Sequence, residues 1–170
     1  MSPSHPPAPP ADPIALRAPR PGDLGWVVQQ HGALYAGEYG FDQRFEGLVA
    51  GIVAEFVARF DPALERCWIA DRGGVPVGCV FLVQKSPGEA QLRMLIVAPE
   101  ARGLGLGGRL VDACIDFARA CGYRRMVLWT NSCLLAAREL YRQRGFVLDR
   151  SEPNHHFGQQ LVGEYWSLEL

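Results

Sequence analysis

The stretch QLRMLIVAPEARGLGLGGRL, residues 91–110, decides the fold of this chain. It reads as an apolar strand that passes through Pro99 into a glycine-rich turn and opens directly into a helix. Because glycine has no Cβ, the backbone of the turn can approach an anion closely and point successive N–H groups at it. The first turn of the helix adds unpaired donors and the positive end of its dipole. The stretch therefore predicts a phosphate site built from Gly103, Gly105, Gly107, Gly108, Arg102 and Arg109.

Other interpretations of these glycines are weaker. Glycines could serve packing alone, although each costs ~1 kcal/mol in a helix. Gly103, Gly105 and Gly108 also satisfy the G-x-G-x-x-G spacing of dinucleotide-binding proteins, but the acid expected about 20 residues later is absent from residues 127–130. A P-loop is excluded, because no Gly-Lys-Ser or Gly-Lys-Thr follows the glycines. Coenzyme A is the phosphate ligand that remains.

Hydrophobic periodicity divides the rest of the chain into strands and helices. The clearest helix has apolar residues at steps of three and four from Phe45 to Phe60, and its polar residues Glu46, Glu55 and Arg59 are expected on a solvated face. The predicted strands are residues 14–18, 67–71, 75–84, 90–97, 125–130, 146–148 and 162–170. The predicted helices are residues 24–35, with Asp23 as N-cap, 45–60, 105–121 and 134–144. This order predicts an α/β sandwich with a mixed sheet rather than a helical bundle.

Composition bounds the domain organisation and the class of protein. Six prolines among the first thirteen residues predict a disordered proline-rich tail at residues 1–13, followed by one domain at residues 14–170. A net charge of −1 provides no basic field for nucleic acid. No run of 18 apolar residues predicts a membrane span. Five cysteines without C-x-x-C or metal-ligand spacing indicate free thiols, a cytoplasmic location and no metal site.

Three motifs together resemble the GNAT superfamily of acetyltransferases. The family's pyrophosphate loop, Q/R-x-x-G-x-G/A, is matched by residues 102–107, its V-x-P step by residues 97–99, and its A-x-x-L-Y-x-x-x-G-F block by residues 137–146. The resemblance covers residues 14–170. It implies one GNAT-like domain with a largely antiparallel sheet, helices on both faces and a splayed central strand pair, and acetyl-CoA as the donor. The ending HHFGQQLVGEYWSLEL is similar to the acetyltransferase half of bacterial MarR–GNAT fusion proteins, although residues 1–13 are too few for a regulator half.

The resemblance also implies which residues hold acetyl-CoA. The backbone of the strand before the loop is expected to bind the pantetheine arm, and the N–H groups of the loop to bind the pyrophosphate. Asn131, Arg138 and Tyr141 are expected near the rest of the cofactor. The implied cofactor-binding residues of the strand and loop are Leu95, Ile96, Val97, Arg102, Gly103, Leu104, Gly105, Leu106, Gly107 and Gly108.

Acyl transfer to an amine needs a base for the amine, donors for the oxyanion and a proton for the departing thiolate. Tyr141 is the expected acid by its motif position, the alternative being a core tyrosine with a paired hydroxyl. The place where better-understood members carry a glutamate base holds Gln91, and a neutral amide cannot accept a proton. The alternative bases are Glu38, Glu46, His155 and His156, or a water chain.

The acceptor site is expected between the first two helices and the central strand. By strand alternation Arg93 lies on the same side as Gln91, so it either binds a carboxylate of the acceptor or pairs internally with Glu38, Asp42 or Glu46. We place Tyr141, Gln91 and Arg93 at the reaction centre. The segment 33–46 is the expected specificity region, and the predicted acceptor contacts are Tyr35, Glu38, Tyr39, Phe41, Glu46, Arg93 and His155.

Three functions fit the sequence. The first is an N-acetyltransferase in which a primary amine of a small molecule, amino acid or peptide attacks acetyl-CoA directly through a tetrahedral intermediate. The second is a non-catalytic acyl-CoA-binding sensor, suggested by Gln91 at the usual position of the base. The third, a nicotinamide-dependent dehydrogenase, rests on the glycine spacing alone. A homodimer is a further expectation.

Overall fold

A computed structural model of the chain describes residues 13–170. The tail predicted at residues 1–13 therefore lies outside the described residues, apart from Pro13. The strands are β1 Ile14–Arg17, β2 Arg66–Arg72, β3 Val75–Ser86, β4 Glu89–Val97, β5 Arg125–Asn131, β6 Val147–Asn154 and β7 Leu161–Glu169. The helices are α1 Asp23–Tyr39, α2 Gln43–Arg59, α3 Leu106–Ala120 and α4 Leu135–Gln143, with a short 3₁₀ turn η1 at Pro99–Ala101.

The strands form one seven-stranded sheet in the order β1-β2-β3-β4-β5-β7-β6. Every neighbouring pair is antiparallel except β4 and β5, which are parallel. The predicted mixed, largely antiparallel sheet is confirmed. A dinucleotide-binding fold requires an open, mostly parallel sheet, so the nicotinamide interpretation of the glycines is wrong.

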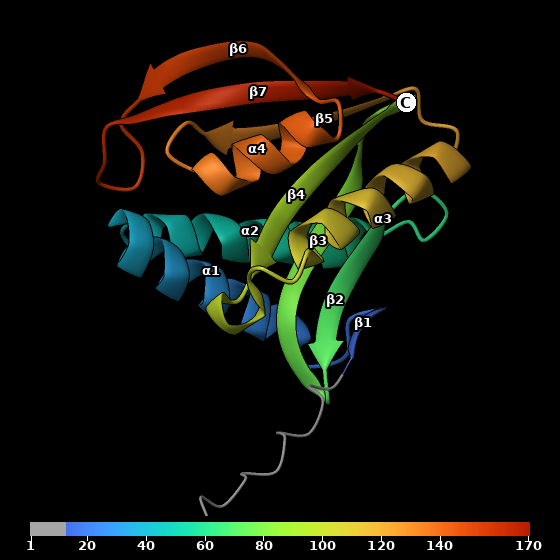
Figure 1. Ribbon diagram of the computed structural model, residues 1–170, viewed down its shortest axis with the longest axis horizontal. Coiled ribbons are helices and arrows are strands. Elements are labelled where there is room, and N and C mark those ends of the chain that lie inside the picture. Colours follow the sequence, from blue (N-terminus) through green and yellow to red (C-terminus); the bar gives the residue numbers. More distant parts are fainter. Residues whose placement is uncertain (1–12) are drawn as a thin grey trace, which may run out of the picture.

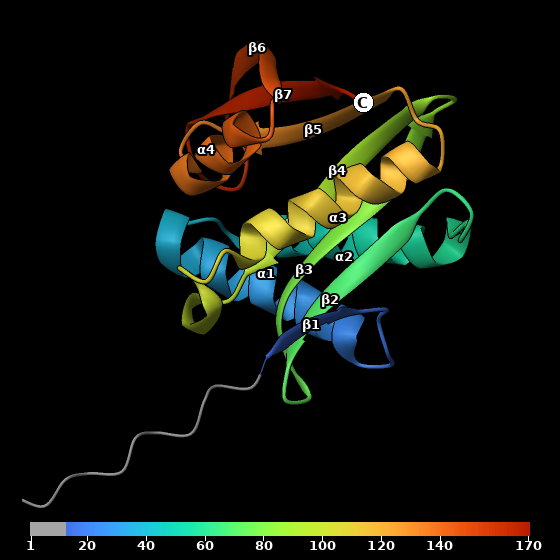
Figure 2. The ribbon, with the colours of Figure 1, turned by 45° about the vertical axis from the view of Figure 1, so that its right-hand side comes forward.

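Helices cover both faces of the sheet and enclose two separate cores (Figure 1 and Figure 2). On one face α3 and α4 pack on the sheet through a core that includes Val80, Leu82, Leu110 and Met126. On the other face α1 and α2 pack on it through a core that includes Phe45, Ile69, Phe81 and Ile96. Alternate residues of β3 enter opposite cores, as the two-residue period of a strand requires. The polar residues Glu46, Glu55 and Arg59 of α2 are exposed, as the periodicity predicts.

Two elements extend beyond their predicted ends. Helix α1 continues past Tyr35 to Tyr39 and ends at Gly40, whose left-handed φ of 70° lets its N–H bond back to the helix. Its N-cap is Gly22 rather than Asp23, which lies inside the first turn. Strand β6 reaches Asn154 through the polar run from Asp149, which includes Pro153. As the exposed outer strand of the sheet, β6 tolerates a proline that an inner strand would exclude.

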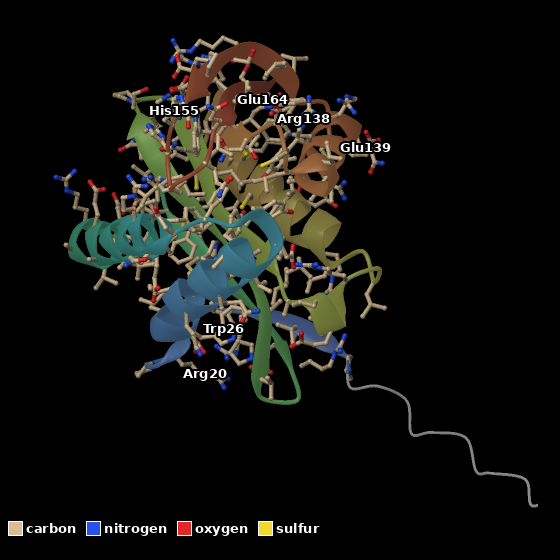
Figure 3. The ribbon with its side chains drawn as sticks, turned by 90° about the vertical axis from the view of Figure 1, so that its left-hand side faces the viewer. Arg20, Trp26, Arg138, Glu139, His155 and Glu164 are labelled. Atoms are coloured by element: carbon tan, nitrogen blue, oxygen red, sulfur yellow. The ribbon has the colours of Figure 1, made fainter. Side chains whose placement is uncertain are left out.

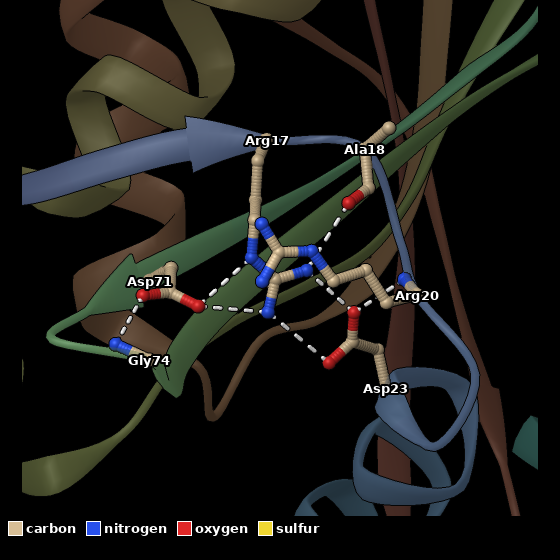
Figure 4. Close-up of polar contacts among 6 residues, drawn as sticks. All are labelled: Arg17, Ala18, Arg20, Asp23, Asp71 and Gly74. Carbon is tan, nitrogen blue, oxygen red and sulfur yellow. Dashed lines mark hydrogen bonds and ion pairs between the residues drawn. The ribbon is translucent and has the colours of Figure 1, made fainter.

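The guanidinium of Arg17 joins β1, β2 and the start of α1 (Figure 4). Its nitrogens lie 2.6 Å from a carboxylate oxygen of Asp23 and 2.8 Å from one of Asp71. Asp23 also accepts the backbone N–H of Arg20, and Asp71 accepts that of Gly74. These charged hydrogen bonds hold the pKa of both carboxyl groups below their ordinary value.

Candidate active site

The two central strands separate partway along their length. Strands β4 and β5 pair only from Glu89 to Gln91 on one side and from Arg125 to Val127 on the other. Beyond Gln91 the two strands diverge (Figure 1). The N–H and C=O groups on that edge of β4 therefore have no strand partner in β5. The separation gives the splayed pair that the resemblance implies.

A β-bulge turns β4 just after the separation. Phe81 of β3 pairs with Arg93 and Cys79 pairs with Ile96, so Met94 and Leu95 both lie opposite Val80. Met94 has a left-handed φ of 56°, which costs about 1–3 kcal/mol for a residue with a side chain. The thiol of Cys79 donates to the Met94 carbonyl at 3.2 Å and so fixes the bulge from the neighbouring strand. The bulge redirects the backbone of the last three residues of β4.

A pocket of about 420 Å³, the glycine-loop pocket, lies between α1, the end of β4, the loop after η1 and α4. Of the implied cofactor-binding residues, nine line this pocket: Leu95, Ile96, Val97, Arg102, Gly103, Gly105, Leu106, Gly107 and Gly108. Its lining is mostly apolar, with the first turn of α3 at one end. Such a pocket suits a long, partly apolar ligand that carries phosphates at one end.

The four glycines of the loop have two different roles. Gly103 and Gly105 have left-handed φ angles of 74° and 71°, and a Cβ on either would meet only open space. Gly107 and Gly108 pack instead against α4 and the residue after it, since a Cβ there would press on Leu140 or collide with the guanidinium of Arg144. Close packing therefore explains Gly107 and Gly108, whereas the left-handed conformation of the loop explains Gly103 and Gly105. The first N–H groups of α3 have no partner within the helix and are available to bind an anion at its start.

Two charged residues of the loop region point in different directions. Arg102 lies 2.7 Å from Glu38 of α1, and this ion pair stands at the edge of the glycine-loop pocket. The guanidinium of Arg109 donates to the Ile14 carbonyl at 2.9 Å, so it holds β1 instead of facing the pocket. Leu104 is 58% exposed and does not line the pocket, so only its backbone is available to a ligand.

A second, smaller pocket of about 140 Å³, the Tyr141 pocket, lies beside the separated strands. It is lined by residues of α1, α2, β4, β5 and α4, among them Gln91, Arg93, Thr130, Asn131 and Tyr141. Tyr35, Leu95, Leu134 and Ala137 line both this pocket and the glycine-loop pocket. The two pockets therefore meet at these four residues, beside the bulge of β4.

Tyr141 lines the Tyr141 pocket and not the glycine-loop pocket. The residue is 5% exposed, and its hydroxyl has no hydrogen-bond partner among residues 13–170. Burial raises the pKa of Tyr141 well above its ordinary value, and the neighbouring Tyr35 adds to this shift. The phenol is therefore neutral and protonated at physiological pH. Tyr141 is also part of the core beneath α3 and α4, but the paired hydroxyl of the alternative has no partner among residues 13–170.

Arg93 and Gln91 share the wall of the Tyr141 pocket, as strand alternation predicts. Arg93 is half-buried, and within residues 13–170 no carboxylate lies within 4 Å of its guanidinium. The three carboxylates that the sequence offers as internal partners of Arg93 do not pair with it. Glu38 pairs with Arg102, Asp42 pairs with Arg44, and Glu46 is exposed. Burial lowers the pKa of Arg93, opposed by the charge of Glu55, so the guanidinium would gain from an anionic partner.

Several other residues predicted to bind the cofactor or the acceptor do not line the pocket expected for them. Asn131 lines the Tyr141 pocket, and Arg138 pairs at 2.9 Å with the buried Glu164, which also accepts the Trp166 indole N–H (Figure 3). Arg138 lines neither pocket, because the buried carboxylate holds it. Among the predicted acceptor contacts, Glu38 and Tyr39 line the glycine-loop pocket instead of the Tyr141 pocket.

Three further predicted acceptor contacts line neither pocket: Phe41, Glu46 and His155. Phe41 is buried in an aromatic cluster with Phe45 and Phe157. His155 is exposed after β6 (Figure 3). The neighbouring His156 is exposed as well, so neither histidine is placed to act as the base.

His31 is a wall residue of the Tyr141 pocket that the sequence reading missed. It lies four residues after Val27 and four before Tyr35, so all three share the buried face of α1. That spacing was the available signal. Helix periodicity alone assigns a histidine on such a face to the core.

Comparison with known proteins identifies the family. Residues 19–146 match the model of the acetyltransferase (GNAT) family. The chain is 36% identical over 136 residues to an uncharacterised N-acetyltransferase of Schizosaccharomyces pombe, covering 79% of each chain. It is 34% identical over 83 residues to an IAA acetyltransferase of Azospirillum brasilense, covering 48% of this chain and 54% of that one.

Solved structures show the same fold. One from Salmonella typhimurium, described as an acetyltransferase with its cofactor acetyl-CoA, matches with a TM-score of 0.75 at 21% identity over 92% of this chain and 94% of that one. The chain therefore belongs to the GNAT family of acetyl-CoA-dependent N-acetyltransferases, whose enzymes use no metal. Over residues 13–170, none of the helices has the length and hydrophobicity of a membrane-spanning segment.

Proposed function

We propose that the chain transfers the acetyl group of acetyl-CoA to a primary amine by direct attack. The observation that carries this proposal is the meeting of the two pockets beside the bulge of β4. The glycine-loop pocket would take the coenzyme, with its pyrophosphate on the N–H groups at the start of α3. The thioester would then lie where the pockets meet, open to an amine that enters through the Tyr141 pocket.

The backbone and Tyr141 supply two of the three chemical needs. The edge of β4 that lacks a partner in β5 offers backbone N–H groups to the oxyanion of the tetrahedral intermediate. The neutral phenol of Tyr141 would give its proton to the departing thiolate of coenzyme A. Gln91 lies in the pocket wall but is an amide, so the base is another group.

The acceptor class we propose is an amine that also carries a carboxylate, such as an amino acid or a peptide. The support is Arg93, a half-buried guanidinium in the wall of the Tyr141 pocket without an ion-pair partner among residues 13–170. A guanidinium binds a carboxylate through two parallel hydrogen bonds and so fixes its orientation. The amino group of the same molecule would then point toward the thioester.

The variant Arg93→Met tests this acceptor class. For amines with a carboxylate, KM should rise about 10–100-fold, since a hydrogen bond to a charged group contributes roughly 1.5–3 kcal/mol. Amines of similar size without a carboxylate should keep their KM, which makes them the internal control. Steady-state assays of thiol release across a matched amine series measure both. An equal rise in KM for both kinds of amine would contradict the assignment.

The donor site is tested by calorimetric titration with acetyl-CoA. Gly105→Glu places a carboxylate at the start of α3, so acetyl-CoA affinity should fall about 10-fold or more. Gly122→Glu is the matched control, because Gly122 also has a left-handed φ, 79°, and open space around its Cβ position, but lies beyond the far end of α3. The control should bind as the wild type does. Wild-type protein that fails to bind acetyl-CoA would remove the basis of the proposal.

The alternative is an acyl-CoA-binding sensor without turnover, and Gln91 in the pocket wall is the observation that favours it. A broad amine screen followed by thiol release separates the two functions. Binding of acetyl-CoA without turnover of any amine would support the sensor.

Three sequence predictions remain proposals. The first is the similarity of the C-terminal stretch to MarR-linked acetyltransferases, and the relatives found include yeast as well as bacterial proteins. The second is a cytoplasmic location, in keeping with five cysteines that are all free. The third is a homodimer.

A further inference from the structure

His31 carries a basic nitrogen without a partner in the wall of the Tyr141 pocket. The residue is 1% exposed and lines the Tyr141 pocket. Its Nδ1 lies 2.8 Å from the Val27 carbonyl oxygen, an acceptor, so Nδ1 carries the hydrogen of the ring. The other nitrogen, Nε2, is buried and has no hydrogen-bond partner among residues 13–170. With the hydrogen on Nδ1, Nε2 holds a free lone pair.

A buried acceptor without a partner is costly, by about 1–3 kcal/mol. Burial lowers the pKa of His31 to about 4, so the ring stays neutral near physiological pH and Nε2 remains an acceptor. Asn131, which is 2% exposed, lines the same pocket. Its amide oxygen is a second acceptor without a partner. A pocket with two free acceptors is matched by a ligand group that brings N–H donors, and a primary amine has two.

The other candidate bases are placed elsewhere. Glu38 is held by Arg102 at the edge of the glycine-loop pocket, and Glu46, His155 and His156 are exposed. Of the residues that line the Tyr141 pocket, His31 is the one whose neutral side chain carries a basic nitrogen. The two aromatic rings beside it, Tyr35 and Phe45, hold the imidazole in place from the helix side.

We propose that Nε2 of His31 accepts an N–H of the acceptor amine and takes that proton as the amine attacks the thioester. This inference rests on the proposed function. The amine lone pair forms the new C–N bond, the C–S bond breaks with its electron pair on sulfur, and Tyr141 protonates that sulfur. The amine nitrogen becomes positively charged as it attacks, which makes its proton acidic enough for a weak base. His31 gains one proton and Tyr141 loses one, so exchange with solvent restores both.

Two variants separate a base from a core histidine. His31→Phe keeps the ring and removes Nε2, so kcat should fall about 10²–10⁴-fold, the usual contribution of a general base. His31→Gln keeps an acceptor oxygen near the position of Nε2 but cannot take a proton, so kcat should fall while the KM for the amine stays near that of the wild type. Acetyl-CoA affinity, measured by calorimetry, should be unchanged in both variants.

The controls keep the outcome unambiguous. His155→Phe makes the same substitution at an exposed histidine outside the pocket and should keep full activity. Thermal unfolding shows that each variant is folded, and His31→Phe should be about as stable as the wild type, because it removes a buried unpaired nitrogen together with the Nδ1 hydrogen bond to Val27. A stable His31→Phe variant with wild-type kcat would overturn the role of His31 while leaving acetyl transfer intact. A wild type that binds acetyl-CoA but acetylates no amine would overturn both.

Discussion

At the scale of single residues, the chemistry depends on polar groups that the fold leaves unpaired. Three such groups belong to the Tyr141 pocket: the Tyr141 hydroxyl, the Arg93 guanidinium and His31 Nε2. None of them has a hydrogen-bond or ion-pair partner among residues 13–170. Buried polar groups are normally satisfied, so His31 Nε2 and the Asn131 amide oxygen, both buried without a partner in the lining of this pocket, indicate a site that is completed by its ligand. The motif reading found Tyr141 and Arg93 because one lies in a family block and the other on an alternating strand.

The role of Tyr141 is open to a direct test. Tyr141→Phe removes the hydroxyl and should lower kcat about 100-fold, because the thiolate then leaves without a proton donor. Acetyl-CoA affinity and thermal stability should change little, since the hydroxyl has no protein partner to lose. Tyr123→Phe is the matched control. The Tyr123 hydroxyl donates to the Leu64 carbonyl at 2.9 Å, and Tyr123 lines neither pocket. An unchanged kcat in Tyr141→Phe would assign the tyrosine to packing.

At the scale of the elements, the sequence predicts the order of strands and helices and locates the phosphate loop. It misses the bulge of β4, because residues 94–97 are all apolar and show no alternation that a bulge would interrupt. The positive φ of Met94 follows from the contact with β3, and no local pattern encodes it. The end of α1 is missed for a related reason: Gly37 resembles a breaker, yet it is helical and exposed.

The sequence likewise predicts one part of the candidate site and misses the other. Motif spacing identifies the residues around the glycine loop, where backbone geometry determines both the sequence and the function. The lining of the Tyr141 pocket depends on which side chains five separate elements bring together, and sequence distance carries no record of that. Glu38 and His155 were reasonable candidates by residue type alone. Glu38 is drawn to Arg102, and His155 lies on a polar segment that the sheet leaves at its edge.

At the scale of the whole molecule, acid stability tests how β1 and α1 are held to the sheet. The pKa of Asp23 and that of Asp71 are lowered, chiefly by hydrogen bonds from Arg17, so both carboxylates stabilise the fold at pH values above their unfolded pKa. That stabilisation is lost as the pH falls through their folded pKa, below the ordinary value of 3.8. Asp23→Asn should therefore lower the free energy of unfolding by about 1–3 kcal/mol at pH 7.

The difference between the wild type and Asp23→Asn should shrink as the pH is lowered from 5 toward about 2, because the wild-type carboxyl group becomes neutral there as well. Urea unfolding at a series of pH values measures it. Asp42→Asn is the control, since Asp42 pairs with Arg44 at an exposed position and asparagine also caps a helix well, so stability should change little. A difference that stays constant between pH 7 and pH 2 would mean that the Asp23 charge does not hold α1 to the sheet. In that case the packing of α1 on β3 and α2 would be enough to keep His31 and Tyr35 in the wall of the Tyr141 pocket.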